Sequence, residues 1–224
     1  MDSIETADGT GAAPLRQGRR DPEGTRRALL AAAVAEFAGK GLAGARVDEI
    51  ARIAGVNKQL VYHYFGSKED LFQAALESVY AEIRAREQDL HLADLPPREA
   101  MEALVGFSFD YLAAHPEFIA ILNDENRHAG RHVGGSGNVR AMNLPLVRLL
   151  AQTLERGIAE GVFRADMDPV NLYVSIAGLS YFYFSNNHTL SAIFGTDLSA
   201  PEAIAARRSH VVAFAMGALR PDAP

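Results

Sequence analysis

The stretch Val47–Phe65, VDEIARIAGVNKQLVYHYF, decides the fold of this chain. Its first half carries apolar residues at i, i+3, i+4 and i+7, the spacing of one stripe on a short helix. These residues are Val47, Ile50, Ala51 and Ala54. Gly55 then suits the left-handed end of a helix, and Asn57 can cap a second helix that runs to Phe65. Two short helices joined by such a turn predict a helix-turn-helix, whose second helix enters the major groove of DNA.

The second helix has two different faces. At about 100° per residue, Val61 and Phe65 point towards the core together with Val56. The outward face carries Gln, which can bond an adenine edge, Leu, which can meet a thymine methyl, and Lys, which can reach guanine or phosphate. Tyr and His on the same face suit phosphate oxygens. The outward residues are Lys58, Gln59, Leu60, Tyr62 and His63. The alternative is a solvated helix, which would be expected to carry more charge.

The segment GVNKQLVYHYFGSKEDLFQAAL, residues 55–76, resembles the signature of the TetR family of bacterial transcriptional repressors. The resemblance covers Thr25 to Leu76 and is looser beyond it. It implies that the DNA contacts are Asn57, Lys58, Gln59, Leu60, Tyr62 and His63, with Lys68 as a phosphate contact. One position departs from the family pattern, because Arg46 stands where the family usually has Ser or Thr. A side-chain cap is lost there, and Arg46 becomes a further candidate phosphate contact.

Charge is divided unevenly along the chain, although the net charge is −6. Residues 16–72 hold ten basic and seven acidic residues, and residues 73–224 hold twelve basic and eighteen acidic residues. A basic segment attached to an acidic remainder is consistent with attraction to phosphates. Three of the basic residues, Arg16, Arg19 and Arg20, belong either to an arm that touches DNA or to an ordinary solvated tail.

Composition excludes several classes of protein. The chain has no Cys, so a disulfide framework, a thiolate metal site and a Cys nucleophile are excluded. The first fifteen residues are too polar for a signal peptide, and the apolar run Tyr173–Phe184 is too short to span a bilayer. We therefore expect a cytoplasmic protein without membrane contact.

Helix patterns follow one another along the whole chain, and nothing predicts a strand. We expect a disordered arm over residues 1–22, a three-helix DNA-binding head over residues 23–72, and a helical ligand-binding and dimerisation body over residues 73–224. Helix starts are predicted at the caps Thr25, Ser67, Asp168 and Ser199. The glycines between Gly130 and Gly137 predict a loose connection before a helix from about Asn143. The predicted fold class is all-α.

The last two predicted helices are apolar on more than one side, with small residues beside large aromatic ones. A helix of this kind must be covered on more than one side. The resemblance implies that both helices pack with those of a second chain in a four-helix bundle. Burial within one chain is the alternative. A homodimer would place two recognition helices about 34–36 Å apart, on successive major grooves of a palindromic operator.

The body also contains candidate ligand-binding groups. They are Asn123, Glu125, Asn126, His128, Tyr173 and Tyr181. The polar residues of LNDENRHAGR, residues 122–131, are alternatively a solvated helix end. His128 and His132 are four residues apart and could share a metal on an unbroken helix. Because Gly130 lies between them, we predict no metal site and no cofactor. The aromatic make-up of the body suggests an unidentified, mostly apolar small molecule as effector.

No catalytic motif supports an enzyme. Gly134–Asn138 has the pattern GxSxN rather than GxSxG, and phosphate-loop, metalloprotease and dinucleotide motifs are missing. The predicted function is a dimeric transcriptional regulator, most simply a repressor, that a small molecule releases from DNA. The alternative is a helical protein-protein interaction module that never touches DNA.

Overall fold

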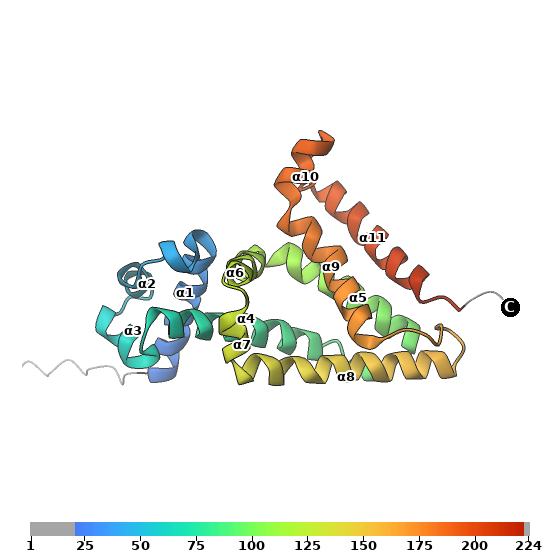
Figure 1. Cartoon of the computed structure of the whole chain (residues 1–224), viewed down its shortest axis with the longest axis horizontal. Helices are drawn as coiled ribbons and strands as arrows, with labels where there is room; N and C mark the ends of the chain where they lie inside the picture. The colour runs from blue at the N-terminus through green and yellow to red at the C-terminus, as the bar shows by residue number, and fades with distance from the viewer. Residues whose placement is uncertain (1–20, 222–224) are drawn as a thin grey trace, which may run out of the picture.

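The computed structural model describes residues 21–221, which form eleven α-helices and one short 3-10 helix without a strand. The predicted all-α fold is confirmed. The helices of the N-terminal end are α1 (Pro22–Gly44), α2 (Val47–Ile53), α3 (Lys58–Phe65) and α4 (Lys68–Gln88). The remaining elements are η1 (Leu92–Asp94), α5 (Pro97–Ala114), α6 (Pro116–Arg127), α7 (Arg131–Gly135), α8 (Gly137–Ala159), α9 (Pro169–Ser185), α10 (Asn187–Phe194) and α11 (Pro201–Ala218). Figure 1 shows α1–α3 gathered at one end, with α9–α11 projecting from the body.

Helix α1 begins earlier than the sequence predicts. Asp21, rather than Thr25, is the N-cap, because its Oδ1 accepts a hydrogen bond from the Gly24 N–H (2.9 Å). The Thr25 hydroxyl instead donates to the Asp21 carbonyl (2.9 Å). Asp21 and Pro22, which the prediction placed in the arm over residues 1–22, belong to the start of α1, and residues 1–20 lie outside the described part of the chain. At the other end Gly41 interrupts α1 with φ 66°, as a glycine at a helix end is expected to do.

Helix α4 connects the head to the body. Its first turns pack in the head, where the Phe37 and Phe72 rings meet edge to face with centroids 5.0 Å apart. Its later turns carry Val79 and Ile83 into the same continuous core, which also includes α5 and α6 residues such as Tyr111 and Phe118. The helix runs through residues 72 and 73 without a break. A movement of the body against α4 would therefore reach the head directly.

The glycine-rich stretch after α6 is helical, so the predicted loose connection is wrong. The Glu125 carboxylate accepts hydrogen bonds from the His132 N–H (2.8 Å) and the Val133 N–H (3.0 Å), which supports the start of α7. Ser136 then caps α8, where its Oγ accepts from the Val139 N–H (3.2 Å). Helix α8 consequently starts at Gly137 instead of near Asn143. A buried carboxylate that meets free N–H groups compensates for the poor helix propensity of glycine.

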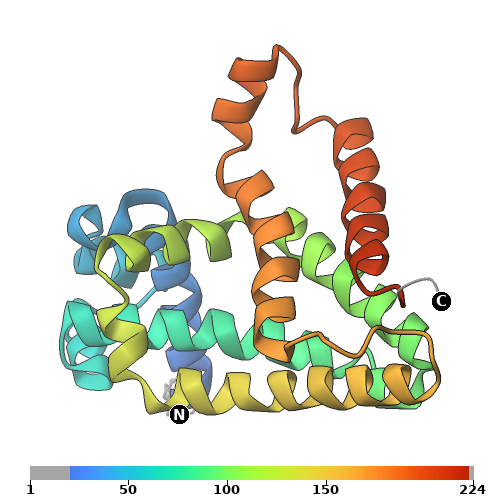
Figure 2. The same ribbon diagram turned by 45° about the vertical axis from the view of Figure 1, so that its right-hand side comes forward.

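The C-terminal helices differ from expectation at their ends. Asp168 caps α9 as predicted, but the helix breaks at Asn186 and a separate helix, α10, follows. Figure 2 shows α10 at the tip of the projection, with α9 and α11 running side by side below it. The predicted Ser199 cap of α11 is wrong, because Ala200 is the N-cap and the Ser199 hydroxyl bonds Asp197 instead (2.5 Å).

One packing contact allows a stability test. The buried Phe163 ring lies directly on Gly157 of α8, where a Cβ would overlap the ring. We expect Gly157→Ala to lower the free energy of unfolding by about 1–3 kcal/mol through overpacking. Gly39→Ala in α1 is the matched control, because nothing lies within 4 Å of its Cβ position, and it should stabilise by up to about 1 kcal/mol. Urea denaturation of both variants measures the difference, and equal stabilities would contradict the prediction.

Candidate nucleic-acid interface and ligand cavity

Helix α3 buries one face and exposes the other. Val61 is 1% exposed and joins the head core, and the Asn57 side-chain oxygen accepts a hydrogen bond from the Gln59 N–H (2.9 Å) to start the helix. Most of the predicted DNA contacts on this helix are exposed, and Leu60 is half-buried; the exposed residues are Asn57, Lys58, Gln59, Tyr62 and His63. Tyr62 is 45% exposed although it is a large aromatic residue. The outward face of α3 is therefore open to a partner.

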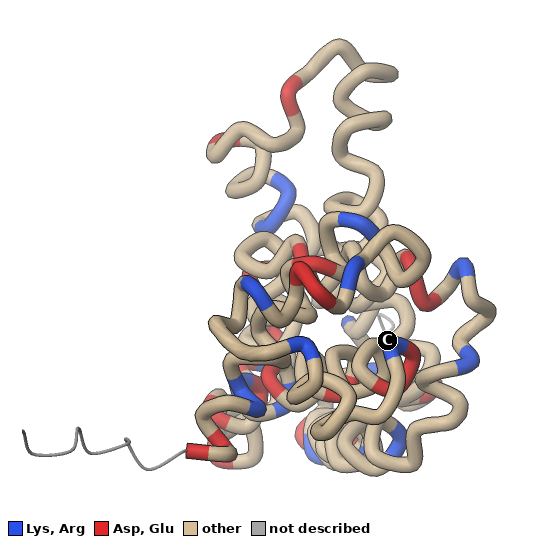
Figure 3. The backbone as a smooth tube through the Cα atoms, turned by 90° about the vertical axis from the view of Figure 1, so that its left-hand side faces the viewer, with Lys and Arg blue, Asp and Glu red and all other residues tan. Residues whose placement is uncertain are grey.

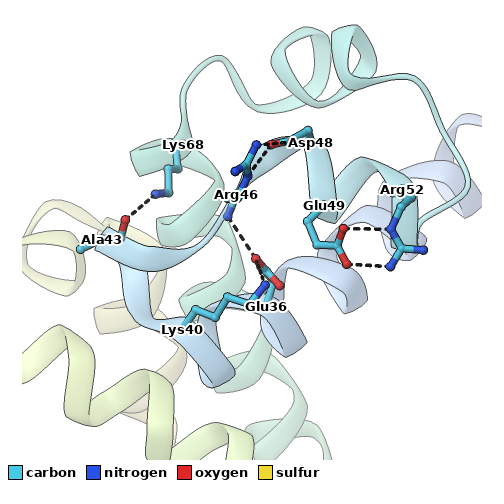
Figure 4. A network of polar contacts seen from close by, with 8 residues as sticks. All are labelled: Glu36, Lys40, Ala43, Arg46, Asp48, Glu49, Arg52 and Lys68. Atoms are coloured by element: carbon cyan, nitrogen blue, oxygen red, sulfur yellow. Dashed lines mark hydrogen bonds and ion pairs between the residues drawn. The ribbon is translucent and has the colours of Figure 1, made fainter.

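A buried glutamate holds the start of α2, where the N-cap residue Arg46 makes no side-chain cap. Glu36 Oε1 accepts from the backbone N–H of Arg46 (3.1 Å) and from Lys40 Nζ (2.9 Å), as Figure 4 shows. The Arg46 guanidinium instead points outward and pairs with Asp48, with Nη2 2.9 Å from Oδ2. This hydrogen bond lowers the pKa of Asp48. A phosphate near Arg46 would have to share the guanidinium with Asp48.

Lys68 lies at the start of α4, close to the turn between α1 and α2. Its Nζ donates to the Ala43 carbonyl (3.3 Å), as Figure 4 shows. A single long hydrogen bond to a neutral carbonyl leaves two ammonium N–H donors for other acceptors. Lys68 therefore has donors to offer a phosphate without losing this contact.

The described head has no excess of positive charge. Residues 21–72 contain seven basic and seven acidic residues, so the excess of residues 16–72 comes from Arg16, Arg19 and Arg20, outside the described part. Exposed pairs such as Arg52 with Glu49 (2.6 Å) also neutralise one another. Figure 3 shows basic and acidic positions interspersed at this end of the molecule. Individual contacts rather than net charge must therefore orient any DNA on this part of the head.

A cavity of about 520 Å³, here called the body cavity, lies between α4, α5, α6 and α9. Its lining is mostly apolar and aromatic, with a few polar groups, as is usual for small-molecule sites. The lining residues are Tyr80, Ile83, Arg84, Glu87, Ser108, Leu112, Phe118, Leu122, Asn126, Tyr173, Val174, Ala177, Gly178 and Tyr181. A larger hollow of about 690 Å³ lies between α1, α4 and α6, but the body cavity is distinguished by the buried charges in its wall.

The six predicted ligand-binding residues are divided by the structure. Asn126, Tyr173 and Tyr181 line the body cavity. Asn123 lies behind it, where its Oδ1 accepts from the Tyr181 hydroxyl (2.6 Å) and its Nδ2 donates to Ser185 (3.1 Å). Asn123 thus orients a lining residue without lining the body cavity itself.

Glu125 and His128 do not line the body cavity. Leu122 and Asn126 share the cavity face of α6, whereas Glu125 and His128 point towards α7 and the head. Glu125 Oε2 lies 2.6 Å from His132 Nδ1, and His128 Nδ1 lies 2.8 Å from the Asp124 carbonyl. Among residues 21–221 no three His, Asp or Glu side chains are grouped as metal ligands.

Arg84 and Glu87 are lining residues that were not predicted from the sequence. They lie one turn apart on α4 with Nη1 2.8 Å from Oε2, and both are buried. The signal was present, because these charged residues stand four positions after Tyr80 and Ile83, on the continuation of the apolar stripe. Charged residues on an apolar stripe indicate a buried ion pair or a binding site.

Glu87 gives the stability of the protein a characteristic pH dependence. Burial raises the pKa of Glu87 to about 7 from 4.5, although Arg84 opposes the rise. Between these values the folded protein keeps a proton that the unfolded chain has lost, so this group's contribution to stability falls as the pH rises. The free energy of unfolding of the wild type should therefore fall by about 1–3 kcal/mol from pH 4.5 to pH 7, and Glu87→Gln should abolish this fall. Urea denaturation at several pH values in this range measures the free energy of unfolding of both proteins. The exposed Glu82→Gln is the control, and a Glu87→Gln profile parallel to that of the wild type would contradict the assignment.

Comparisons with known proteins agree with this architecture. The family described as "Bacterial regulatory proteins, tetR family" matches residues 29–75, and "Tetracyclin repressor-like, C-terminal domain" matches residues 97–214. The HTH-type transcriptional repressor NicS of Pseudomonas putida is 41% identical over 196 residues, which cover 88% of this chain and 92% of NicS. The repressor SCO4008 of Streptomyces coelicolor is 41% identical over 111 residues, 50% of this chain and 54% of that protein.

Solved structures share the fold. The transcriptional regulator SCO4942 of Streptomyces coelicolor superposes with a TM-score of 0.66 at 25% identity, over 87% of this chain and 98% of that one. FadR of Bacillus subtilis, solved in complex with stearoyl-CoA, has a TM-score of 0.68 at 17% identity, over 87% of this chain and all of that one. No helix among the described residues is long and apolar enough to cross a membrane. With both of its domain types and most of its length matched, the chain belongs to the TetR family of bacterial transcriptional regulators.

Proposed function

We propose that this protein is a cytoplasmic repressor that binds a palindromic operator as a homodimer and leaves it when a small molecule occupies the body cavity. The observation that carries the proposal is α3, whose buried Val61 fixes the helix while Gln59, Tyr62 and His63 stay exposed. The relatives named as repressors support repression rather than activation of transcription. The predicted roles of Asn57, Lys58, Lys68 and Arg46 as further DNA contacts belong to this proposal.

A face of α9 and α11 supports dimerisation through the two C-terminal helices. Val170, Val174 and Phe182 repeat along one side of α9, and Val174 and Phe182 are 61% and 59% exposed. Phe214 of α11 is 57% exposed. Exposed apolar side chains that cluster in this way mark a protein contact. A second copy would cover them in a two-fold symmetric interface.

Thermodynamic linkage between effector binding and DNA binding is enough to account for the proposed release from the operator. A ligand shifts the equilibrium between two conformations only if it prefers one of them. The body cavity is lined by α4, which also carries the head, and by α9, which carries the proposed dimer face. A ligand that prefers a different separation of the two heads therefore weakens operator binding.

The test measures binding to DNA from around the protein's own gene by fluorescence anisotropy. We expect the wild type to bind with an affinity that decreases as salt rises. Gln59→Ala should weaken specific binding by about 1–3 kcal/mol if this side chain reads a base. Gln152→Ala, the same change on the exposed surface of α8, should bind like the wild type.

The outcome separates the proposal from the interaction module. Full DNA binding by both Gln59→Ala and Tyr62→Ala would mean that the outward face of α3 is idle. Wild-type binding that is insensitive to salt would count against phosphate contacts. Either result would count against the proposal, and a wild type that binds no DNA would favour a helical protein-protein interaction module.

A further inference from the structure

The wall of the body cavity contains a buried arginine with unused donors. Arg84 is 7% exposed. Its Nη1 forms an ion pair with Glu87 Oε2 (2.8 Å) that lacks hydrogen-bonding geometry, and within residues 21–221 Nε has no hydrogen-bond partner. A buried donor without a partner costs free energy, so such a group in a cavity wall points to an acceptor that the protein does not supply.

We propose that the effector is a mostly apolar molecule with one carboxylate and that Arg84 binds this carboxylate in the body cavity. This inference rests on the effector site of the proposed function. The unsatisfied atoms of Arg84 are N–H donors, so the ligand has to bring an acceptor. The planar guanidinium matches a carboxylate through two parallel hydrogen bonds.

The remaining lining fits the apolar part of such a molecule. Tyr80, Phe118 and Leu122 enclose the space with aromatic and aliphatic surface, and Asn126 adds an amide. A volume of about 520 Å³ accommodates a small organic acid. A dianion such as a phosphate ester would bring a second negative charge close to Glu87, so a monocarboxylate is favoured.

Glu87 favours an anion over a cation as the ligand. Burial raises the pKa of Glu87 to about 7, so near neutral pH the side chain is partly protonated and compensates the charge of Arg84 only in part. An amine would need the ionised form of Glu87 and would leave the Arg84 donors unsatisfied. A carboxylate satisfies those donors and restores charge balance in the cavity.

The experiment compares a carboxylate with its neutral amide on the full chain by isothermal titration calorimetry. The probes are 2-naphthoate with 2-naphthamide, and the smaller benzoate with benzamide. We expect the wild type to bind at least one acid about tenfold or more tightly than its amide, because a charge-assisted hydrogen bond is lost with the amide. In Arg84→Met the ratio of acid to amide affinity should approach one. Arg148→Met, the same change on the exposed surface of α8, should keep the wild-type ratio.

Arg84→Lys keeps the test valid if Arg84→Met does not fold, which thermal melts would reveal. It retains the charge but loses the two-pronged geometry, so the ratio should lie between those of the wild type and one. Equal binding of acid and amide by the wild type, failure of both acids to bind at millimolar concentration, or an unchanged ratio in the folded Arg84 variants would overturn the inference.

DNA release separates this inference from the proposed function. An acid that binds through Arg84 without weakening operator binding supports the carboxylate site and counts against release through the body cavity. An amide that binds as well as its acid and releases DNA supports the release mechanism and overturns the carboxylate inference.

Discussion

Phe182→Glu is expected to turn the proposed homodimer into a monomer and to abolish tight binding to its operator. Phe182 is 59% exposed on α9, on the face that we propose a second copy covers. Burying a phenylalanine contributes about 1.5–3 kcal/mol, and a two-fold interface loses this contribution twice, so the dimer should weaken by about two to four orders of magnitude. Buried glutamates without partners add to the loss. Each monomer would then reach only one half-site.

Sedimentation equilibrium and anisotropy with operator DNA measure the two effects together. Leu144→Glu is the control, because Leu144 is exposed to a similar degree, 45%, but lies on α8. It should leave both the dimer and the DNA affinity unchanged. A Phe182→Glu protein that remains dimeric at low concentration would place the dimer interface elsewhere.

Asp124→Ala is expected to destabilise the protein more than most single substitutions. The buried Asp124 carboxylate of α6 accepts a hydrogen bond from the Leu42 N–H, directly after the break in α1 at Gly41. Burial alone would raise the pKa of Asp124, but the hydrogen bonds from Arg127 and from the Leu42 N–H outweigh it and lower the pKa. Alanine leaves a buried N–H without a partner, which costs about 2–3 kcal/mol.

Urea denaturation at neutral pH measures this loss. The folded pKa of Asp124 is lowered, so its contribution is present at neutral pH and is lost as the pH falls below the ordinary carboxyl range. Asp110→Ala is the control, because Asp110 pairs with Arg208 at the surface (2.7 Å) and should contribute less than about 1 kcal/mol. Equal losses in the two variants would show that the bond between α6 and α1 does not stabilise the native state.

The recognition segment was predictable because its structure depends on neighbours in the sequence. The stripe from Val47 to Ala54, the glycine at position 55 and the cap at Asn57 act within one or two helical turns, and the observed helices follow them. The body cavity was predictable only in part. Asn126 and Tyr173 line it, whereas Glu125, a candidate ligand-binding group in the sequence, forms hydrogen bonds to α7 instead. Polarity along the chain does not reveal which side of α6 meets α7.

The amino-acid sequence by itself determined the all-α class, the helix-turn-helix and the family, because these follow from helical periodicity and from motifs of adjacent residues. Only the tertiary structure decided which charged groups are buried against other parts of the chain and what they contact there. Glu36 supports the start of α2, Asp124 bonds the break in α1 from 82 residues away, and Arg84 lines the body cavity with an Nε that has no hydrogen-bond partner among the described residues. These roles require residues distant in the chain to meet in a buried environment, where an unpaired donor or charge is costly, and no local pattern encodes such a meeting.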